Sequence, residues 1–74
     1  MRFPEECLET TRESVTALAE QVAERHDVNA TVVVMEFYEI VDEMAWSVIE
    51  LTEEEWRYAW RKTNNTFKEV TPAE

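Results

Sequence analysis

The chain has 74 residues, of which 17 are Asp or Glu and 7 are Lys or Arg, so its formal net charge is −10. This length suits a single small domain over residues 1–74, with little room for a buried catalytic pocket; residues 71–74 are expected to form a frayed tail. Phosphate backbones are bound by basic patches. The charge therefore argues against direct nucleic-acid binding and favours a basic protein surface as partner.

The few residues able to ligate metals or act as nucleophiles point away from catalysis. Cys7 is the one cysteine and His26 the one histidine, which excludes an internal disulfide and leaves too few ligands for zinc. Helical spacing separates the two, so neither activates the other. We expect no metal, no cofactor and no enzymatic activity. Cys7 is predicted to be a small core residue, and His26 a capping or packing residue.

Hydropathy and charge near the N-terminus bear on localisation. The longest purely apolar run, Val32-Val33-Val34-Met35, is too short to cross a bilayer. The first residues are charged, unlike those of a signal peptide, and a lone thiol suits a reducing compartment. We expect a cytoplasmic protein without membrane contact.

The first predicted element is an amphipathic helix from about Pro4 to His26. Pro4 and the glutamates after it are typical of a helix start, and Arg25 and His26 suit the C-terminal end. Apolar and small side chains recur every three to four residues along one stripe, which consists of Leu8, Thr11, Val15, Leu18, Ala19, Val22 and His26.

The corner that follows, residues 23–32, resembles the turn of a helix-turn-helix motif. Val28 takes the place of the apolar residue that plugs the corner, and Asn29 that of the cap of the second helix. The sequence departs from the motif at Asp27, where glycine is usual, and in the glutamates that follow, where a DNA reader needs Arg, Lys, Asn or Gln. The resemblance implies a helical corner, and the glutamates argue against DNA binding.

The middle segment, Thr31 to Leu51, admits two interpretations. Its valines and aromatic residues favour strands, with a hairpin turning near Asp42 and Glu43, and this would give an α+β helix–β-hairpin–helix fold. Helical periodicity instead places Glu36, Glu39, Glu43, Ser47 and Glu50 on one side, and Val33, Phe37, Ile40, Val41, Met44, Val48 and Leu51 on the other. The periodicity, and the lack of glycine for a tight turn, favour one helix.

The last predicted element is a helix from Glu53 to Lys68. Thr52 and Glu55 match the capping box S/T-x-x-E. The predicted buried stripe is Trp56, Ala59, Trp60, Thr63 and Phe67, and the predicted solvent row is Glu54, Arg57, Arg61, Asn65 and Lys68. The fold class is therefore predicted as all-α, a small three-helix domain with a helix-turn-helix-like first corner.

Charge is distributed unevenly along the chain. Residues 30–56 carry eight acids and no base, whereas residues 57–74 carry four bases and two acids. Side chains three and four apart on a helix rise about 4.5 to 6 Å along its axis, the same order as the roughly 3.4 Å between phosphates of one DNA strand. The predicted partner-binding residues are Glu36, Glu39, Asp42, Glu43, Glu50, Glu53 and Glu54, with Tyr38 and Trp46 as aromatic anchors at the rim.

These patterns predict a non-enzymatic acidic interaction module that docks on a basic protein surface. In the sharper version it mimics DNA and blocks a nucleic-acid-binding host or defence enzyme, by analogy with small phage-type inhibitors. The alternative is a homodimeric structural or regulatory adaptor without mimicry. In that case the basic row of one copy would meet the acidic row of another; this row is Arg57, Arg61, Lys62 and Lys68.

Overall fold

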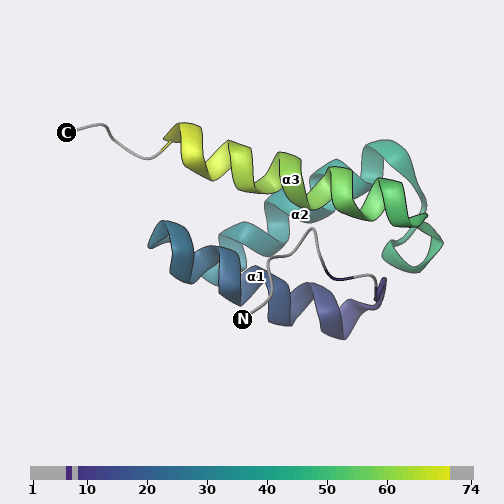
Figure 1. Cartoon of the computed structure of the whole chain (residues 1–74), viewed down its shortest axis with the longest axis horizontal. Coiled ribbons are helices and arrows are strands. Elements are labelled where there is room, and N and C mark those ends of the chain that lie inside the picture. Colours follow the sequence, from purple (N-terminus) through teal and green to yellow (C-terminus); the bar gives the residue numbers. More distant parts are fainter. Residues whose placement is uncertain (1–6, 8, 71–74) are drawn as a thin grey trace.

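The computed structural model describes residue 7 and residues 9–70, apart from the side chains of residues 69 and 70. These residues form the helices α1 (Arg12–His26), α2 (Ala30–Met44) and α3 (Glu53–Val70), with a 3-10 turn η2 (Val48–Glu50) before α3 (Figure 1). The described part contains no strand. The all-α prediction is therefore confirmed, and the helix–hairpin–helix alternative is wrong.

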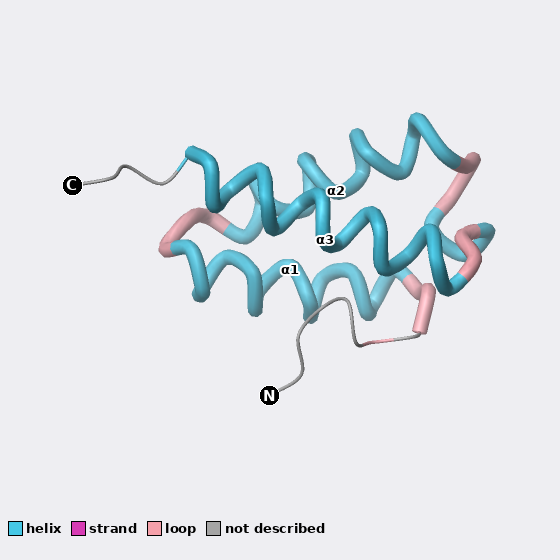
Figure 2. The backbone as a smooth tube through the Cα atoms, turned by 45° about the horizontal axis from the view of Figure 1, so that its top comes forward, coloured by secondary structure: helices cyan, strands magenta, loops and turns pink. Residues whose placement is uncertain are grey.

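The helices form a small bundle in which the chain reverses direction at each corner (Figure 1). Figure 2 shows the same arrangement from a second angle, with the loops at the two ends of the bundle. α2 packs closely against both α1 and α3, which touch each other less. As the shared neighbour, α2 buries one side and leaves the opposite side to solvent.

α1 begins later than the sequence pattern predicts. The described residues before it, Cys7, Glu9 and Thr10, are not helical. Thr11 is the N-cap, and its Oγ1 accepts a hydrogen bond from the Ser14 backbone N–H at 3.0 Å. This cap satisfies an amide that has no partner within the helix, so α1 begins at Arg12 and not near Pro4. Pro4, Leu8 of the predicted stripe and the predicted tail at residues 71–74 lie outside the described residues.

The first corner has the geometry predicted from its resemblance to a helix-turn-helix turn. Asp27 adopts the left-handed conformation, with φ 57° and ψ 48°. Val28 donates its backbone N–H to Ala23 O at 2.9 Å and packs, half-buried, against the core. Asn29 caps α2 by accepting a hydrogen bond from the Thr31 N–H at 2.7 Å.

α2 is shorter than predicted, because it ends at Met44 and does not continue to Leu51. Ala45 is extended, with φ −153°, and its N–H donates to Val41 O at 2.8 Å. The chain then turns through η2 toward α3. Val48 and Leu51 are buried as predicted, although they lie outside the helix. Tertiary packing overrides helical continuity here, because α3 must return alongside α2.

α3 confirms the predicted start and the predicted faces. The Thr52 N–H donates to Glu55 Oε1 at 3.0 Å, and the Glu55 N–H donates to Thr52 Oγ1 at 3.2 Å, which completes the capping box. All members of the predicted buried stripe are buried, and Asn64 joins them. All members of the predicted solvent row are exposed.

Aromatic rings from α2 and α3 form the centre of the core. The Phe37 ring stacks on Trp60 with 4.0 Å between centroids, and meets Trp56 edge-on at 5.6 Å. The two indoles pack edge-to-face at 5.9 Å. All three side chains are fully buried. Such geometries are the favoured arrangements of aromatic pairs, so this cluster joins the two helices firmly.

His26 has the packing role that the sequence predicts, whereas Cys7 lies at the edge of the core and is not part of it. His26 is half-buried at the end of α1, where its Nε2 lies 3.2 Å from Asn64 Oδ1 and its ring lies 6.4 Å from that of Phe67. In the tautomer that is protonated at Nε2, the imidazole donates this hydrogen bond to α3. Cys7 is half-buried against the core.

Candidate functional site

The side of α2 that faces solvent combines carboxylates with apolar side chains. Val32 is 48% exposed and Met35 is 60% exposed, although both are apolar. Glu39, Asp42 and Glu43 are also exposed. These five residues are here called the outer face of α2. A mixture of this kind is typical of protein interfaces, which have apolar centres and polar rims.

The acidic ladder predicted from the sequence is only partly on one helix. Glu36, Glu39 and Glu43 lie three and four residues apart on α2; Glu39 and Glu43 are exposed, and Glu36 is half-buried. Glu50 lies on η2, and Glu53 and Glu54 lie in the first turn of α3. The expectation of one continuous helical ladder is therefore wrong, because α2 ends at Met44. The regular rise per residue applies only to the α2 part.

The carboxylates of the outer face are not neutralised within the described part of the chain. No described Lys, Arg or His nitrogen lies within 4.0 Å of the carboxylate oxygens of Glu39, Asp42 or Glu43. The last turn of α2 contains no basic residue, whereas α1 ends with Arg25 and His26. The negative end of the α2 dipole therefore adds to the local negative potential.

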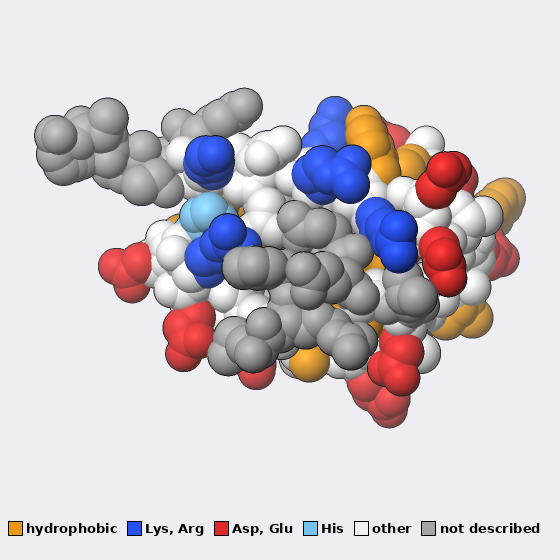
Figure 3. Space-filling model, in the orientation of Figure 1, with side chains coloured by type: hydrophobic (Ala, Val, Ile, Leu, Met, Phe, Trp, Pro, Cys, Tyr) orange, Lys and Arg blue, Asp and Glu red, His pale blue; other side chains and the backbone are white. Residues whose placement is uncertain are grey.

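The segment after α2 presents two large apolar side chains to solvent. Trp46 is 93% exposed and Ile49 is 67% exposed. A shallow hollow of about 340 Å³ lies at the end of α2 and the start of the segment that follows. This α2-end hollow is lined by Asp42, Glu43, Met44, Ala45 and Trp46. Figure 3 shows carboxylates and exposed hydrophobic side chains together at the end of the molecule where α2 connects to α3.

The predicted rim aromatics have different environments. Trp46 projects into solvent, as a rim anchor would. Tyr38 is half-buried, and its ring meets Phe37 edge-on at 6.0 Å, so it also supports the core. Sequence reasoning did not single out Val32 or Ile49 as surface residues. For Val32 the signal is helical phase, because at 100° per residue it falls outside the apolar sector of α2, whereas Ile49 lies beyond the end of α2, where this phase does not apply.

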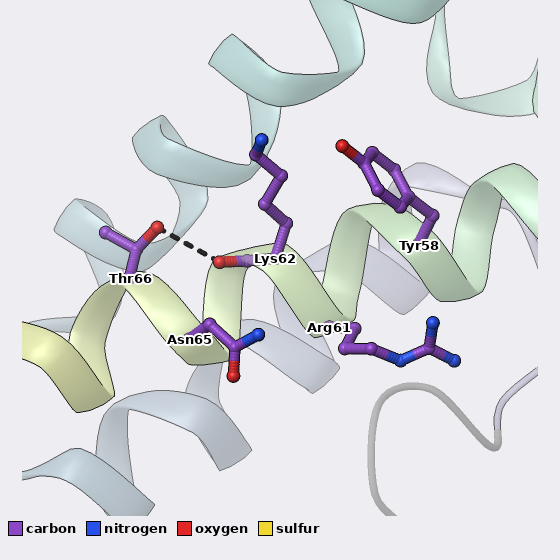
Figure 4. Close-up of a pocket in the computed structure, with 5 residues that line it drawn as sticks. All are labelled: Tyr58, Arg61, Lys62, Asn65 and Thr66. Carbon is purple, nitrogen blue, oxygen red and sulfur yellow. Dashed lines mark hydrogen bonds between the residues drawn. The ribbon is translucent and has the colours of Figure 1, made fainter.

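Basic side chains gather on the exposed face of α3. Figure 3 shows Lys and Arg along this helix, with Asp and Glu toward the ends of the same view. A shallow hollow of about 440 Å³ is lined by Tyr58, Arg61, Lys62, Asn65 and Thr66. Lys62 Nζ lies 5.7 Å from the centre of the Tyr58 ring, within the range of a cation–π contact. In Figure 4, Lys62 and Tyr58 extend toward α2, whereas Arg61 and Asn65 extend to the other side.

The described residues give no sign of a metal centre or a membrane segment. Nowhere among them do three or more His, Cys, Asp or Glu side chains form a group that could hold a metal ion. None of the helices in this part of the chain has the length and apolar character needed to cross a bilayer.

The fold and the surface define the class of this protein, a small all-α domain with an acidic and apolar face on α2 and a basic face on α3. Comparisons with protein-family models, with curated proteins and with solved structures gave no match. The surface of the described residues is therefore what indicates the function.

Proposed function

We propose that this protein is a non-enzymatic interaction module that docks the outer face of α2 on a basic protein surface. The observation that carries the proposal is the run of eight acids without a base over residues 30–56, whose outer-face members have no basic partner among the described residues. Charge of one sign accelerates encounter with a partner of the opposite sign. Met35 of the outer face and the exposed Trp46 supply apolar area whose burial stabilises a complex.

In its sharper form, the proposal is that the acidic face occupies a groove made for DNA. Glu36, Glu39 and Glu43 rise about 4.5 and 6 Å along α2, which is the same order as the spacing of backbone phosphates. A nucleic-acid-binding enzyme presents basic side chains to the phosphates of its substrate. The protein would then inhibit such an enzyme by competing with its substrate.

The test compares charge reversal on two helices. The first variant reverses the charge of the outer face of α2 by combining Glu39→Lys, Asp42→Lys and Glu43→Lys. The second changes the net charge by the same amount at exposed positions of α1, by combining Glu13→Lys, Glu20→Lys and Glu24→Lys. The partner is recovered from the native host by photo-crosslinking and identified by mass spectrometry, and binding is then measured by surface plasmon resonance. We expect the α2 variant to lose at least about tenfold in association rate, and the α1 variant to lose much less.

Two further results distinguish the forms of this proposal. Equal losses in both charge-reversed variants, or binding that strengthens with added salt, would contradict docking through α2. Competition between duplex DNA and this protein for the partner supports mimicry. A ternary complex with DNA rules mimicry out and leaves the general docking proposal in place.

A second candidate function is homodimerisation, favoured by the segregation of charge between α2 and α3. The exposed Arg57 and Arg61 of one copy, four residues apart on α3, could meet Glu39 and Glu43 of another. Sedimentation velocity at tens of micromolar should then show a dimer that dissociates in Arg57→Glu/Arg61→Glu. Mixing that variant with Glu39→Lys/Glu43→Lys should restore a heterodimer. A monomer at all concentrations tested removes this candidate.

A further inference from the structure

Two kinds of residue line the α2-end hollow. Asp42 and Glu43, which carry carboxylates, come from the last turn of α2, and Trp46, which carries an indole, comes from the segment that follows. Trp46 is 93% exposed, which leaves a large apolar ring in water. Trp is the best cation–π partner among the side chains, and it is enriched among residues that dominate binding energy at interfaces.

The end of α2 also lacks the cation that helix C-termini favour. α1 has Arg25 and His26 in its last turn and α3 has Lys68, but α2 has no basic residue there. Positive charge at a helix C-terminus is favourable because it offsets the negative end of the dipole. In α2 the carboxylates of Asp42 and Glu43 lie at that same end and make the local electrostatic potential more negative.

We infer that this hollow binds an arginine or lysine side chain of the protein partner, with the cation between the Trp46 ring and the carboxylates of Asp42 and Glu43. The inference rests on the proposed function and names the chemistry that the partner must present. A side-chain cation suits both kinds of lining residue. Its positive charge is attracted to the carboxylates, and its alkyl chain and its guanidinium or ammonium group can pack against the indole. Ile49, which is 67% exposed and three residues after Trp46 in the chain, gives a neighbouring part of such a partner an apolar side chain to cover.

Binding of a cation in the α2-end hollow is tested with a pair of short peptides that differ only in charge. Acetyl-Ala-Arg-Ala-amide is titrated to about 10 mM, because a single cation–π contact in water is weak, and the matched peptide carries neutral citrulline in place of arginine. A lysine and acetyl-lysine pair repeats the comparison. The Trp46 indole N–H signal in a nitrogen–proton correlation spectrum reports binding, and Trp46→Phe assigns this signal among the three tryptophans.

We expect the charged peptides to shift the Trp46 indole signal saturably and the neutral peptides to bind about tenfold more weakly. Asp42→Asn/Glu43→Gln should weaken binding of the charged peptides severalfold. The matched control Glu20→Gln/Glu24→Gln changes two exposed carboxylates of α1 and should leave binding nearly unchanged. Trp46→Leu keeps an apolar side chain but should also weaken binding, followed at the Ala45 backbone amide.

Equal binding of charged and neutral peptides overturns the inference, and so does an equal effect of the α1 and α2 variants or an unperturbed Trp46 signal. All substituted side chains are exposed, so a circular dichroism melt serves as the check that each variant folds. The whole partner then separates the two proposals. One outcome is that charge reversal of the outer face abolishes binding of the partner, while Asp42→Asn/Glu43→Gln and Trp46→Leu leave that binding intact. In that case the proposed function stands, and the inference of a cation-binding hollow is wrong.

Discussion

Asp27 is the residue on which the first corner turns, and it is the one described residue with positive φ. A left-handed residue after a helix is usually glycine, because a Cβ is disfavoured in that conformation. The carboxylate also lies at the negative end of the α1 dipole, which is unfavourable. The sequence departs here from the motif that it resembles, and the structure keeps the motif's geometry at an energetic cost.

We predict that Asp27→Gly stabilises the protein. Relief of the left-handed strain and loss of the negative charge should outweigh the added freedom of the unfolded chain by about 0.5 to 1 kcal/mol. Glu20→Gly is the matched control: its position is exposed and in the middle of α1, away from both helix ends, so that change should lower the free energy of unfolding by about 0.5 kcal/mol. Urea denaturation measures both. Shifts of the same sign in the two variants would contradict the argument.

The cap of α2 provides a second prediction at the scale of one residue. Asn29→Ala removes the acceptor for the Thr31 N–H, 2.7 Å away, and should cost about 1 kcal/mol of stability. Asn65→Ala serves as the comparison, because Asn65 is exposed within α3, where alanine is the better helix former. That variant should be neutral or slightly stabilised in the same denaturation experiment, and an equal loss in both would mean that the Asn29 cap is not the cause.

At the scale of elements, α2 joins the bundle through Phe37. Its ring stacks on Trp60 at 4.0 Å and meets Trp56 at 5.6 Å, so a single side chain connects α2 to two turns of α3. The same helix turns Met35 and Val32 outward. One element therefore has a packing side and a side available to a partner, and substitutions on the two should separate stability from binding.

We predict that Phe37→Ala lowers the free energy of unfolding by about 3 to 5 kcal/mol, because it leaves a cavity in the aromatic cluster. The free energy of unfolding of a small domain is about 5 to 15 kcal/mol in total, so this variant should be close to unfolding at 25 °C. Met35→Ala, two residues away and 60% exposed, should change stability by less than about 0.5 kcal/mol. Thermal melts followed by circular dichroism test both variants. Similar losses of stability in the two would mean that the packing side of α2 is not the one described.

At the scale of the whole molecule, the net charge of −10 acts over a radius of gyration of 11.5 Å. At about 0.01 M salt the Debye length is roughly 30 Å, so carboxylates across the entire molecule repel one another. The unfolded chain places the same charges farther apart, which lowers their repulsion. The folded state is therefore the one that added salt should favour.

We predict that the free energy of unfolding rises when NaCl is increased from about 0.01 M to about 1 M, where the Debye length falls to roughly 3 Å. Glu39→Gln/Glu43→Gln should reduce this salt dependence by removing repulsion. Arg57→Gln/Arg61→Gln should increase it by raising the net negative charge. Denaturation curves at the two salt concentrations measure all three proteins. A salt dependence that is unchanged in both variants would contradict the account.

Much of the fold could be predicted because its signals are local. The phase of Phe37, Ile40 and Val41 identifies α2 as a helix in spite of its β-favouring composition, and burial of these residues bears this out. The capping box of Thr52 and Glu55 marks the start of α3 to the residue. The start of α1 was misplaced because the apolar stripe continues upstream of the Thr11 cap, and periodicity alone does not show where a helix begins.

The candidate site was less predictable, because it depends on where α2 stops. Nothing local forbids the helix from continuing past Met44, and the predicted ladder assumed that it does. The turn through η2 takes Glu50 off the helix and brings Trp46 beside Asp42 and Glu43. That juxtaposition arises from the return of α3 along the bundle.

The net charge of the protein is a sum over its residues and so follows from composition alone. The three helices and the caps at the corner and at α3 can also be predicted, since they depend on groups within about four residues of one another. Which apolar residues remain in solvent and which carboxylates share a hollow depends instead on how the helices pack. Val48 and Leu51 are buried while Trp46 and Ile49 are exposed, because the path between α2 and α3 is set by packing against distant residues.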